Sequence, residues 1–230
     1  MAAETICEGV YLVGGASLSH FEDAMAFAVE CSGELVLIDS GAGRGARALE
    51  MNIRSIAGGT AKPSTLILTH CHVDHIGSAK HLRDAFGCRV LAHELDAGAI
   101  ETGDPALTAA SWYGIALPKT PVDRRLKGDH EIITAADGQE FHCLHTPGHT
   151  PGSISVYLDR GGKRVLFGQD IHGPFSDEFN SDIALWRESM ERLLELEADI
   201  LCEGHFGIFT GKDRVRRYIQ DYLDRYAGEY

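Results

Sequence analysis

The sequence of 230 residues has no long apolar run. No apolar stretch approaches the roughly 18 residues of a membrane-spanning helix. Basic residues are also scarce: 21 Lys and Arg stand against 34 Asp and Glu, a formal net charge of −13. Because Lys and Arg hold nucleic-acid phosphates and anionic membranes, neither is an expected partner. We expect a small molecule instead, and a homodimer as the oligomeric form to test.

Two further patterns are missing. None of the six cysteines forms a Cys-x-x-Cys pair, and the start, Met-Ala-Ala-Glu-Thr, is no secretory signal. Reduced thiols in the cytoplasm are therefore expected. There is no Gly-x-Ser-x-Gly, the motif that presents a serine nucleophile in many hydrolases.

No repeat, low-complexity tract or linker divides the chain, so we expect one domain over residues 1–230. Strands dominate and helices alternate with them, which favours an α+β fold with two packed sheets and helices outside. An irregular segment near 93–128 interrupts this pattern. The predicted strands are Thr5–Val13, Ala24–Glu30, Glu34–Asp39, Thr65–Thr69, Cys88–Ala92, Glu131–Ile133, Glu140–Leu144, Ser153–Leu158, Arg164–Phe167 and Asp199–Cys202, and the predicted helices are Arg44–Ala57, Ile76–Phe86, Ser181–Glu197 and Asp213–Tyr226.

A histidine cluster follows one buried strand directly. It consists of His70, His72, Asp74 and His75. Three imidazoles and a carboxylate are costly to bury unless something binds them, and such donors suit zinc, iron or manganese. The alternative is a polar helix cap with solvated histidines. Four metal-competent side chains within six residues favour the metal.

Three later turns have the same form, a strand followed by a metal-competent residue near glycine. They carry His149, Asp170 and His205. Glycine lets the backbone bend sharply and lets a ligand come close. The ordered recurrence of these turns behind the first cluster makes the three residues further candidate ligands.

In this combination the sequence resembles the metallo-β-lactamase-fold superfamily. The signature H-x-H-x-D-H falls on His70 to His75, and the match runs from Leu37-Ile38-Asp39-Ser40-Gly41 through His205. The resemblance implies an αββα sandwich with two metal ions at one edge, between the sheets. It implies one ion on His70, His72 and His149, another on Asp74, His75 and His205, Asp170 as the bridge, and Asp39 as a residue that orients the ligand loop.

Two cations about 3.5–4 Å apart can share a water and lower its pKa toward neutrality. We expect two divalent ions, zinc in the first place and iron or manganese as alternatives. Asp74 is the expected catalytic residue, which steers the attacking water or passes its proton to the leaving group.

The run Thr-Pro-Gly-His-Thr-Pro-Gly-Ser and the strand leading to Gly-Gln-Asp170 are closest to the glyoxalase II-like group. That resemblance implies thioester hydrolysis. The 25 residues after His205 do not visibly supply the glutathione-holding helices of glyoxalase II, so another thioester, such as an acyl-CoA, fits equally well. The usual Gly-Asp is altered here to Gln169-Asp170.

Other reactions stay open. A lactone hydrolase of the N-acyl-homoserine-lactone type would use the same metals. A persulfide dioxygenase shares the appearance of Thr69–His75 but would bind a single iron, and no Arg-rich segment follows Asp170. A β-lactamase would need export, and a non-enzymatic metal-binding module is least favoured.

The substrate pocket is the least determined feature. The irregular segment is expected to cover the active site and to line it with Trp112 and Tyr113, joined by His172 and Phe175. Phe179 is a further candidate, whereas Trp186 and Cys71 are expected to be buried packing residues. A basic patch facing the metals would favour a CoA or carboxylate substrate, and a closed apolar pocket would favour an acyl lactone; the residues for such a patch are Lys119, Arg124, Arg125 and Lys127.

Overall fold

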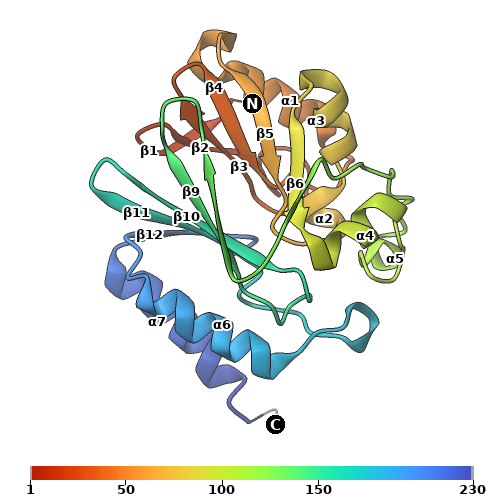
Figure 1. The fold of residues 1–230 in the computed structure, drawn as a ribbon, viewed down its shortest axis with the longest axis vertical. Coiled ribbons are helices and arrows are strands. Elements are labelled where there is room, and N and C mark those ends of the chain that lie inside the picture. Colours follow the sequence, from red (N-terminus) through yellow and green to blue (C-terminus); the bar gives the residue numbers. More distant parts are fainter. Residues whose placement is uncertain (1, 229–230) are drawn as a thin grey trace.

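The computed structural model describes residues 2–228 and contains two packed β-sheets (Figure 1). The first sheet has seven strands in sequence order. Pairs from β1 to β4 are antiparallel and pairs from β4 to β7 are parallel. The strands are β1 (Glu4–Cys7), β2 (Val10–Gly14), β3 (Ala26–Cys31), β4 (Glu34–Ile38), β5 (Lys62–Ile67), β6 (Arg89–His93) and β7 (Arg124–Leu126).

The second sheet has six strands in the order β13-β12-β11-β10-β9-β8. Its β11–β12 pair is parallel and the other pairs are antiparallel. The strands are β8 (His130–Thr134), β9 (Glu140–His145), β10 (Ile154–Arg160), β11 (Lys163–Gln169), β12 (Ile200–Glu203) and β13 (Ile208–Thr210).

Three apolar layers hold the sandwich together. Alternate residues of both sheets face each other in the central layer, where the rings of Phe27 and Phe167 lie 5.2 Å apart. Helices α1 (Ala46–Ser55) and α3 (Ala79–Phe86) pack on the outer face of the first sheet. On the other outer face, α6 (Ile183–Glu195) and α7 (Lys212–Arg225) cover the second sheet (Figure 1). The αββα sandwich is therefore confirmed.

Some predicted elements are divided differently. The strand predicted over Thr5–Val13 is two strands, because the chain turns at Glu8 and Gly9 (φ +67°). The helix predicted over Ile76–Phe86 is a short α2 (Val73–Ile76) followed by α3. Gly77 lies between them, and a Cβ there would come within 2.2 Å of the Ala42 backbone.

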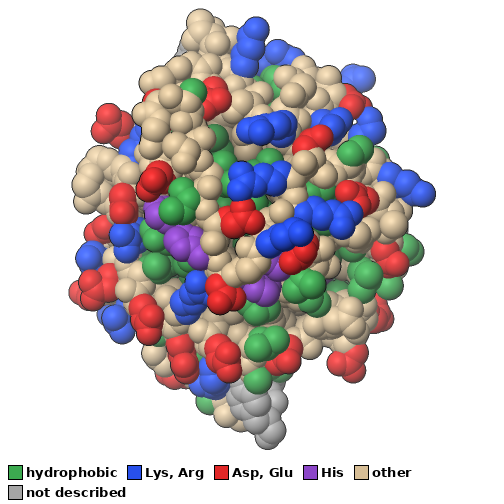
Figure 2. Space-filling model, viewed as in Figure 1, with side chains coloured by type: hydrophobic (Ala, Val, Ile, Leu, Met, Phe, Trp, Pro, Cys, Tyr) green, Lys and Arg blue, Asp and Glu red, His purple; other side chains and the backbone are tan. Residues whose placement is uncertain are grey.

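The irregular segment near 93–128 contains ordered pieces: α4 (Glu94–Thr102), α5 (Ala110–Tyr113) and strand β7. Strand β13 was not predicted, and short 3₁₀ turns cover Ile56–Gly59 and Asp177–Phe179. In the described part of the chain, the helices are all too short or too polar to cross a membrane. On the face of the molecule that Figure 1 also shows, Lys and Arg side chains lie among Asp and Glu side chains (Figure 2).

Candidate metal centre

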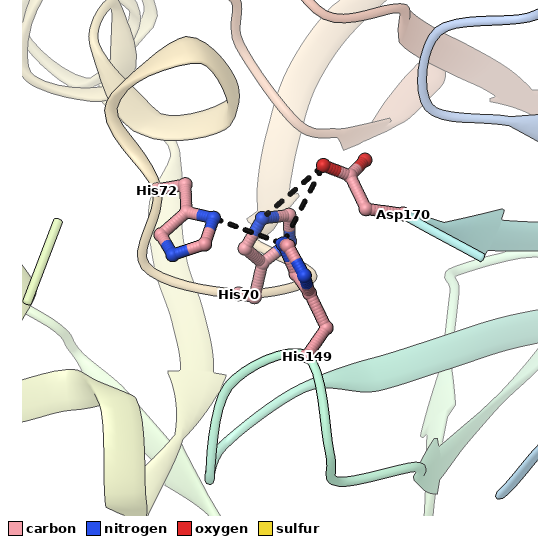
Figure 3. Close-up of side chains that lie close together, drawn as sticks. All are labelled: His70, His72, His149 and Asp170. Atoms are coloured by element: carbon pink, nitrogen blue, oxygen red, sulfur yellow. Dashed lines mark hydrogen bonds and ion pairs between the residues drawn. The ribbon is translucent and has the colours of Figure 1, made fainter. Parts of the chain in front are cut away.

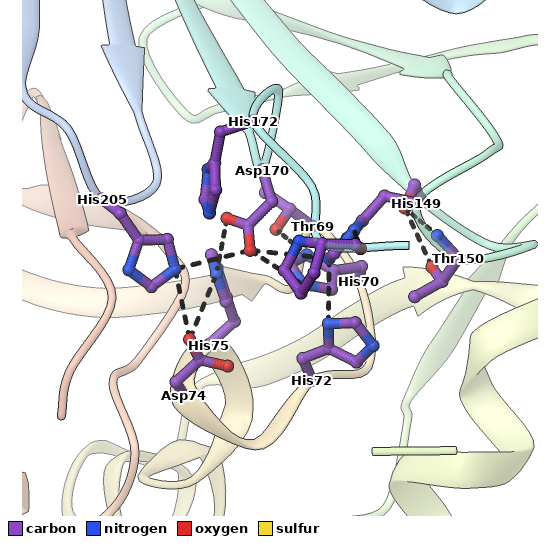
Figure 4. Close-up of polar contacts among 12 residues, drawn as sticks. Thr69, His70, His72, Asp74, His75, His149, Thr150, Asp170, His172 and His205 are labelled. Carbon is purple, nitrogen blue, oxygen red and sulfur yellow. Dashed lines mark hydrogen bonds and ion pairs between the residues drawn. The ribbon is translucent and has the colours of Figure 1, made fainter. Parts of the chain in front are cut away.

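Four strand ends deliver the candidate ligands to one edge of the sandwich. The loop after β5 and the short α2 carry the first four of them. The loops after β9, β11 and β12 carry the other three. These seven side chains meet in two groups that share Asp170 (Figures 3 and 4); they are His70, His72, Asp74, His75, His149, Asp170 and His205.

The first group contains three imidazoles and the shared carboxylate. Nδ1 of His72 lies 2.9 Å from Nε2 of His149. Oδ2 of Asp170 lies 3.5 Å from Nε2 of His149 and 4.0 Å from Nε2 of His70. All four side chains are buried, and Figure 3 shows them converging from three separate loops.

The second group lies on the other side of Asp170. Nε2 of His75 is 3.0 Å from Oδ1 of Asp170, and Nε2 of His205 is 3.4 Å from Oδ2. Oδ2 of Asp74 is 3.2 Å from Nε2 of His205 and 4.0 Å from Nε2 of His75. Asp170 therefore faces histidines of both groups (Figure 4).

The spacing within the groups fits a metal ion. Two ligands about 2.0–2.1 Å from a tetrahedral ion lie roughly 3.3–3.4 Å apart. The distances within each group, 2.9–4.0 Å, bracket that value. One ion per group is therefore geometrically possible, with Asp170 in contact with both.

Unpartnered polar atoms support the same fit. Nε2 of His70, Nε2 of His75 and Oδ1 of Asp170 are buried without a hydrogen bond; the 3.0 Å approach of His75 to Asp170 lacks hydrogen-bond geometry. Buried polar atoms are almost always satisfied, so a cluster of such atoms without hydrogen bonds fits a site that binds an ion or a water.

Partners on the far side of the rings orient several ligands. Nδ1 of His149 lies 2.9 Å from the Pro174 carbonyl oxygen, and Nδ1 of His70 lies 3.1 Å from the Thr69 hydroxyl. When Nδ1–H donates to such a partner, Nε2 keeps a lone pair for a metal.

The charges divide between the two groups. Burial lowers the pKa of His70 and of His72 well below the ordinary value and that of His149 to about 4. These rings are therefore neutral imidazoles, each with a lone pair available for a metal. Burial also disfavours the charged forms of His75 and His205, but nearby carboxylates, Asp170 above all, outweigh it and raise both pKa values, that of His205 to about 10. A metal ion bound in the second group would displace these protons.

Asp39 lies directly behind the second group, at the position expected of an orienting residue. Its Oδ2 is 2.8 Å from Nδ1 of His75 and accepts a hydrogen bond from the Thr69 hydroxyl at 2.8 Å. Its Oδ1 accepts one from the Thr69 amide at 2.8 Å. One buried carboxylate thus fixes the strand end and a candidate ligand together.

Asp96 is a buried residue that the sequence reasoning missed. Its carboxylate accepts hydrogen bonds from the Cys71 amide (2.9 Å), the Thr150 hydroxyl (2.7 Å) and the Gly152 amide (2.7 Å). It therefore ties the His70–His72 loop of one sheet to the His149 loop of the other. Its place in the first turn of α4 resembles that of an ordinary acidic residue near a helix start, so the sequence carries no distinguishing signal.

Cys71 belongs to this packing and lies outside both groups. It is buried, and its thiol donates to the Leu107 carbonyl at 3.2 Å, as expected for a small packing residue. Trp186 is also buried, beside Met190 in the apolar layer under α6.

A cleft opens over the metal-site residues in two lobes. The first, the aromatic lobe, has a volume of about 340 Å³; besides the metal-site residues it is lined by Ala109, Trp112, Tyr113, His172, Pro174, Phe179 and Phe206. The second, the loop lobe, has a volume of about 470 Å³ and is lined by Leu12, residues 15–17 and 21–23, Met25, Tyr113 and His205. Tyr113 and His205 belong to both lobes, so the lobes meet at the metal-site residues.

Of the predicted pocket residues, some line the cleft and one does not. Trp112, Tyr113 and His172 line the aromatic lobe, so the irregular segment does border the cleft. Phe175 packs instead against Trp186 and Tyr226, at ring distances of 5.3 and 5.0 Å. Phe206 was not singled out, although it directly follows the candidate ligand His205 in a glycine-rich loop.

His172 is held by a buried acid. Its Nδ1 lies 2.9 Å from Oε1 of Glu203, while Oε2 of Glu203 accepts from the amides of His205 and Phe206 at 2.7 Å each. Glu203 therefore orients a cleft histidine and the turn that carries His205.

The basic residues do not gather over the site. Arg124, Arg125 and Lys127 pair with Glu131, Glu101 and Glu94. These three and Lys119 are absent from the described lining of both lobes.

The sandwich and its paired His/Asp groups define a metallo-hydrolase-type site, and comparisons with known proteins agree. A family model described as the metallo-beta-lactamase superfamily matches residues 22–205. The chain belongs to the metallo-beta-lactamase superfamily, and at that level it is a hydrolase.

Individual relatives point the same way. The chain is 28% identical over 207 residues to the probable metallo-hydrolase YflN of Bacillus subtilis, covering 77% of each protein. It is 36% identical over 110 residues to the hydroxyacylglutathione hydrolase GloC of Haemophilus influenzae, covering 46% of this chain and 48% of GloC. A metallo-beta-lactamase of Cronobacter sakazakii with a HARLDQ motif has a similar structure, with a TM-score of 0.82 at 21% identity over 100% of this chain and 94% of that one.

Proposed function

We propose that this protein is a dinuclear metal-dependent hydrolase that cleaves a thioester. The observation that carries the dinuclear part is Asp170, whose two carboxylate oxygens approach histidines of both groups. One ion would be held by His70, His72, His149 and Asp170, and the other by Asp74, His75, His205 and Asp170.

The ligand types suit a borderline divalent metal such as zinc. Five imidazoles and two carboxylates form a borderline nitrogen and oxygen set, which suits zinc and also iron or manganese. When bound, two such ions supply Lewis-acid polarisation of a carbonyl and a water that ionises near neutral pH.

The chain's own residues have distinct roles in this proposal. Asp74 lines the cleft with an oxygen near His205, where it can take a proton from the attacking water and return it to the leaving group. Tyr113 lies where the two lobes meet and can donate a hydrogen bond to the substrate. Trp112 and Phe179, 5.4 Å apart between ring centroids, form an apolar wall that excludes water.

The likeness to GloC supports thioester cleavage, because that relative is named for hydrolysing a glutathione thioester. The lining of the cleft keeps a second candidate, a lactone hydrolase, open. No Lys or Arg lines either lobe in the described part of the chain, which suits an uncharged acyl lactone. Six free cysteines, five of them buried, support a location in the reducing cytoplasm.

Metal analysis combined with a substrate panel tests the proposal. Protein purified without added metal should hold about two ions per chain and hydrolyse a thioester or a lactone. The variant Asp170→Asn should hold at most one ion and lose at least about a hundredfold in kcat/KM, because its amide cannot serve as a charged bridge. Asp177→Asn, an exposed acid in the same loop, is the matched control.

A single iron per chain, with oxygen uptake on a persulfide and no hydrolysis, would replace this proposal by a dioxygenase. Bound metal without turnover of any ester would favour a non-enzymatic metal-binding module instead.

A further inference from the structure

The side chains around the cleft point to the chemistry of its substrate. Seven large apolar side chains are notably exposed in the described part of the chain, and three of them line the cleft. They are Phe21 (73% exposed), Phe206 (60%) and Trp112 (52%). Exposed aromatic residues gathered at one concave site indicate a binding surface.

The three aromatics border different parts of the cleft. Trp112 and Phe206 line the aromatic lobe and Phe21 lines the loop lobe. Apolar contact is therefore available on both sides of the metal-site residues, where the two lobes meet.

Lys and Arg side chains are missing from these walls. In the described residues that line the two lobes there is no Lys or Arg. Arg44 lies beside the loop lobe, where it forms an ion pair with the lining residue Glu22 at 2.8 Å. His172 is likewise engaged by the buried Glu203.

Acidic groups do stand beside the cleft. Glu22 and Asp23 line the loop lobe, and Glu178 accepts a hydrogen bond from the Trp112 indole at 2.9 Å on the rim of the aromatic lobe. These carboxylates, in a chain with a net charge of −13, disfavour anions at the parts of the lobes that lie away from the metal-site residues. The phosphates of a CoA carrier or the carboxylates of glutathione would find no Lys or Arg partner among the described lining residues and would be repelled by these acids.

We propose that the cleft is built for an uncharged substrate with apolar groups on both sides of the bond that is cut. The substrate class is a neutral apolar thioester or ester, and recognition does not involve an anionic carrier. This inference rests on the proposed hydrolase function and narrows its substrate.

Matched thioesters test the inference in the metal-loaded, full-length protein. Octanoyl thioesters of N-acetylcysteamine, CoA and glutathione share the acyl group and differ in carrier charge. We expect kcat/KM for the neutral carrier to exceed that for each anionic carrier at least tenfold, and octanoyl to exceed acetyl at least tenfold on the neutral carrier. Equal or higher kcat/KM with CoA or glutathione, or no gain from the longer acyl group, overturns the proposal.

Variants locate the effect. Trp112→Ala and Phe206→Ala should each reduce the octanoyl-over-acetyl ratio at least threefold, because they remove apolar wall. The matched control is Met51→Ala, which truncates a residue that is 66% exposed on α1, outside the described lining of the cleft, and should leave the ratio unchanged. An unchanged ratio in both cleft variants also overturns the proposal.

A binding measurement separates this inference from the hydrolase proposal. The amide analogue of the octanoyl N-acetylcysteamine thioester cannot be cut readily, and its binding is measured by calorimetry. If no ester is hydrolysed but this neutral amide binds at least tenfold more tightly than the corresponding amide analogue of octanoyl-CoA, the hydrolase proposal fails and the cleft assignment stands. If hydrolysis occurs but the anionic analogue binds as tightly, the cleft assignment fails alone.

Discussion

Asp39 holds the ring of His75 from behind. Oδ2 of Asp39 lies 2.8 Å from Nδ1 of His75, and on the other side of the ring Nε2 lies 3.0 Å from Asp170. A carboxylate in this position fixes the orientation of the ring and increases its basicity toward a metal. Asp39 itself has φ +60°, a conformation that Asn tolerates well.

The variant Asp39→Asn should therefore still fold, but it should bind metal more weakly than the wild type. Replacing a carboxylate behind a ligating histidine typically costs 10–100-fold in metal affinity, and we expect a loss in that range. Competition with a chelator of known affinity measures it at fixed pH, with Asp177→Asn as the control. Unchanged affinity would show that His75 does not depend on Asp39 for its orientation.

Asp96 should matter for stability as well as for the metal site. In Asp96→Asn at least one of the three hydrogen-bond donors must face the new amide NH₂, and an unsatisfied buried donor costs about 1–3 kcal/mol. Urea unfolding of the metal-free protein measures the loss. Thr150→Val removes only one donor and should cost less than Asp96→Asn; the reverse order would contradict the role of Asp96 as the shared acceptor.

Gly148 precedes the candidate ligand His149 and has no room for a side chain. A Cβ there would lie 2.3 Å from the Trp186 backbone, and φ is +132°. Gly148→Ala should cost roughly 2–4 kcal/mol, from the clash and the strained backbone together. Gly138→Ala separates the two causes, because Gly138 also has positive φ (+86°) but nothing within 4 Å of a Cβ. Equal losses in the two unfolding measurements would mean that contact with Trp186 is unimportant.

His93 should make the protein less stable in mild acid. Burial, and then the positive charge of the stacked His145 ring 4.0 Å away, lower the pKa of His93 below its ordinary value near 6.5. The imidazole of His93 then binds a proton more readily in the unfolded chain than in the folded one. Its contribution to the stability of the folded state is therefore complete above about pH 6.5 and is lost as the pH falls toward the folded pKa.

The variant His93→Asn tests this pH dependence. In the wild type the Leu95 amide donates a hydrogen bond to Nδ1 of His93 at 3.4 Å. The Asn side chain keeps an acceptor for this amide and removes the titrating ring. Urea unfolding at pH 7.5 and 5.5 should show a smaller acid-induced loss in the variant than in the wild type. An equal loss would assign the acid sensitivity to other groups.

The local sequence was sufficient where one segment carries the whole signal. The buried strand β5 running into His70–His75, and the glycine-flanked turns at His149, Asp170 and His205, identified the candidate ligands, and the family resemblance that these motifs carry implied the sandwich and the division of the ligands into two groups. These residues share a side-chain chemistry that is costly to bury without a partner, and their order along the chain follows the order of the strands.

Only the tertiary structure decided which distant residues support and surround them. Asp96 joins loops of two sheets, Glu203 orients His172, and Phe206 and Phe21 border opposite lobes of the cleft. Phe175 was predicted to line the pocket, but it packs away from the cleft because the fold turns its ring toward Trp186. A ligand's identity follows from its own chemistry and is visible in the sequence, whereas a pocket wall is defined by which segments, far apart in the chain, pack against each other.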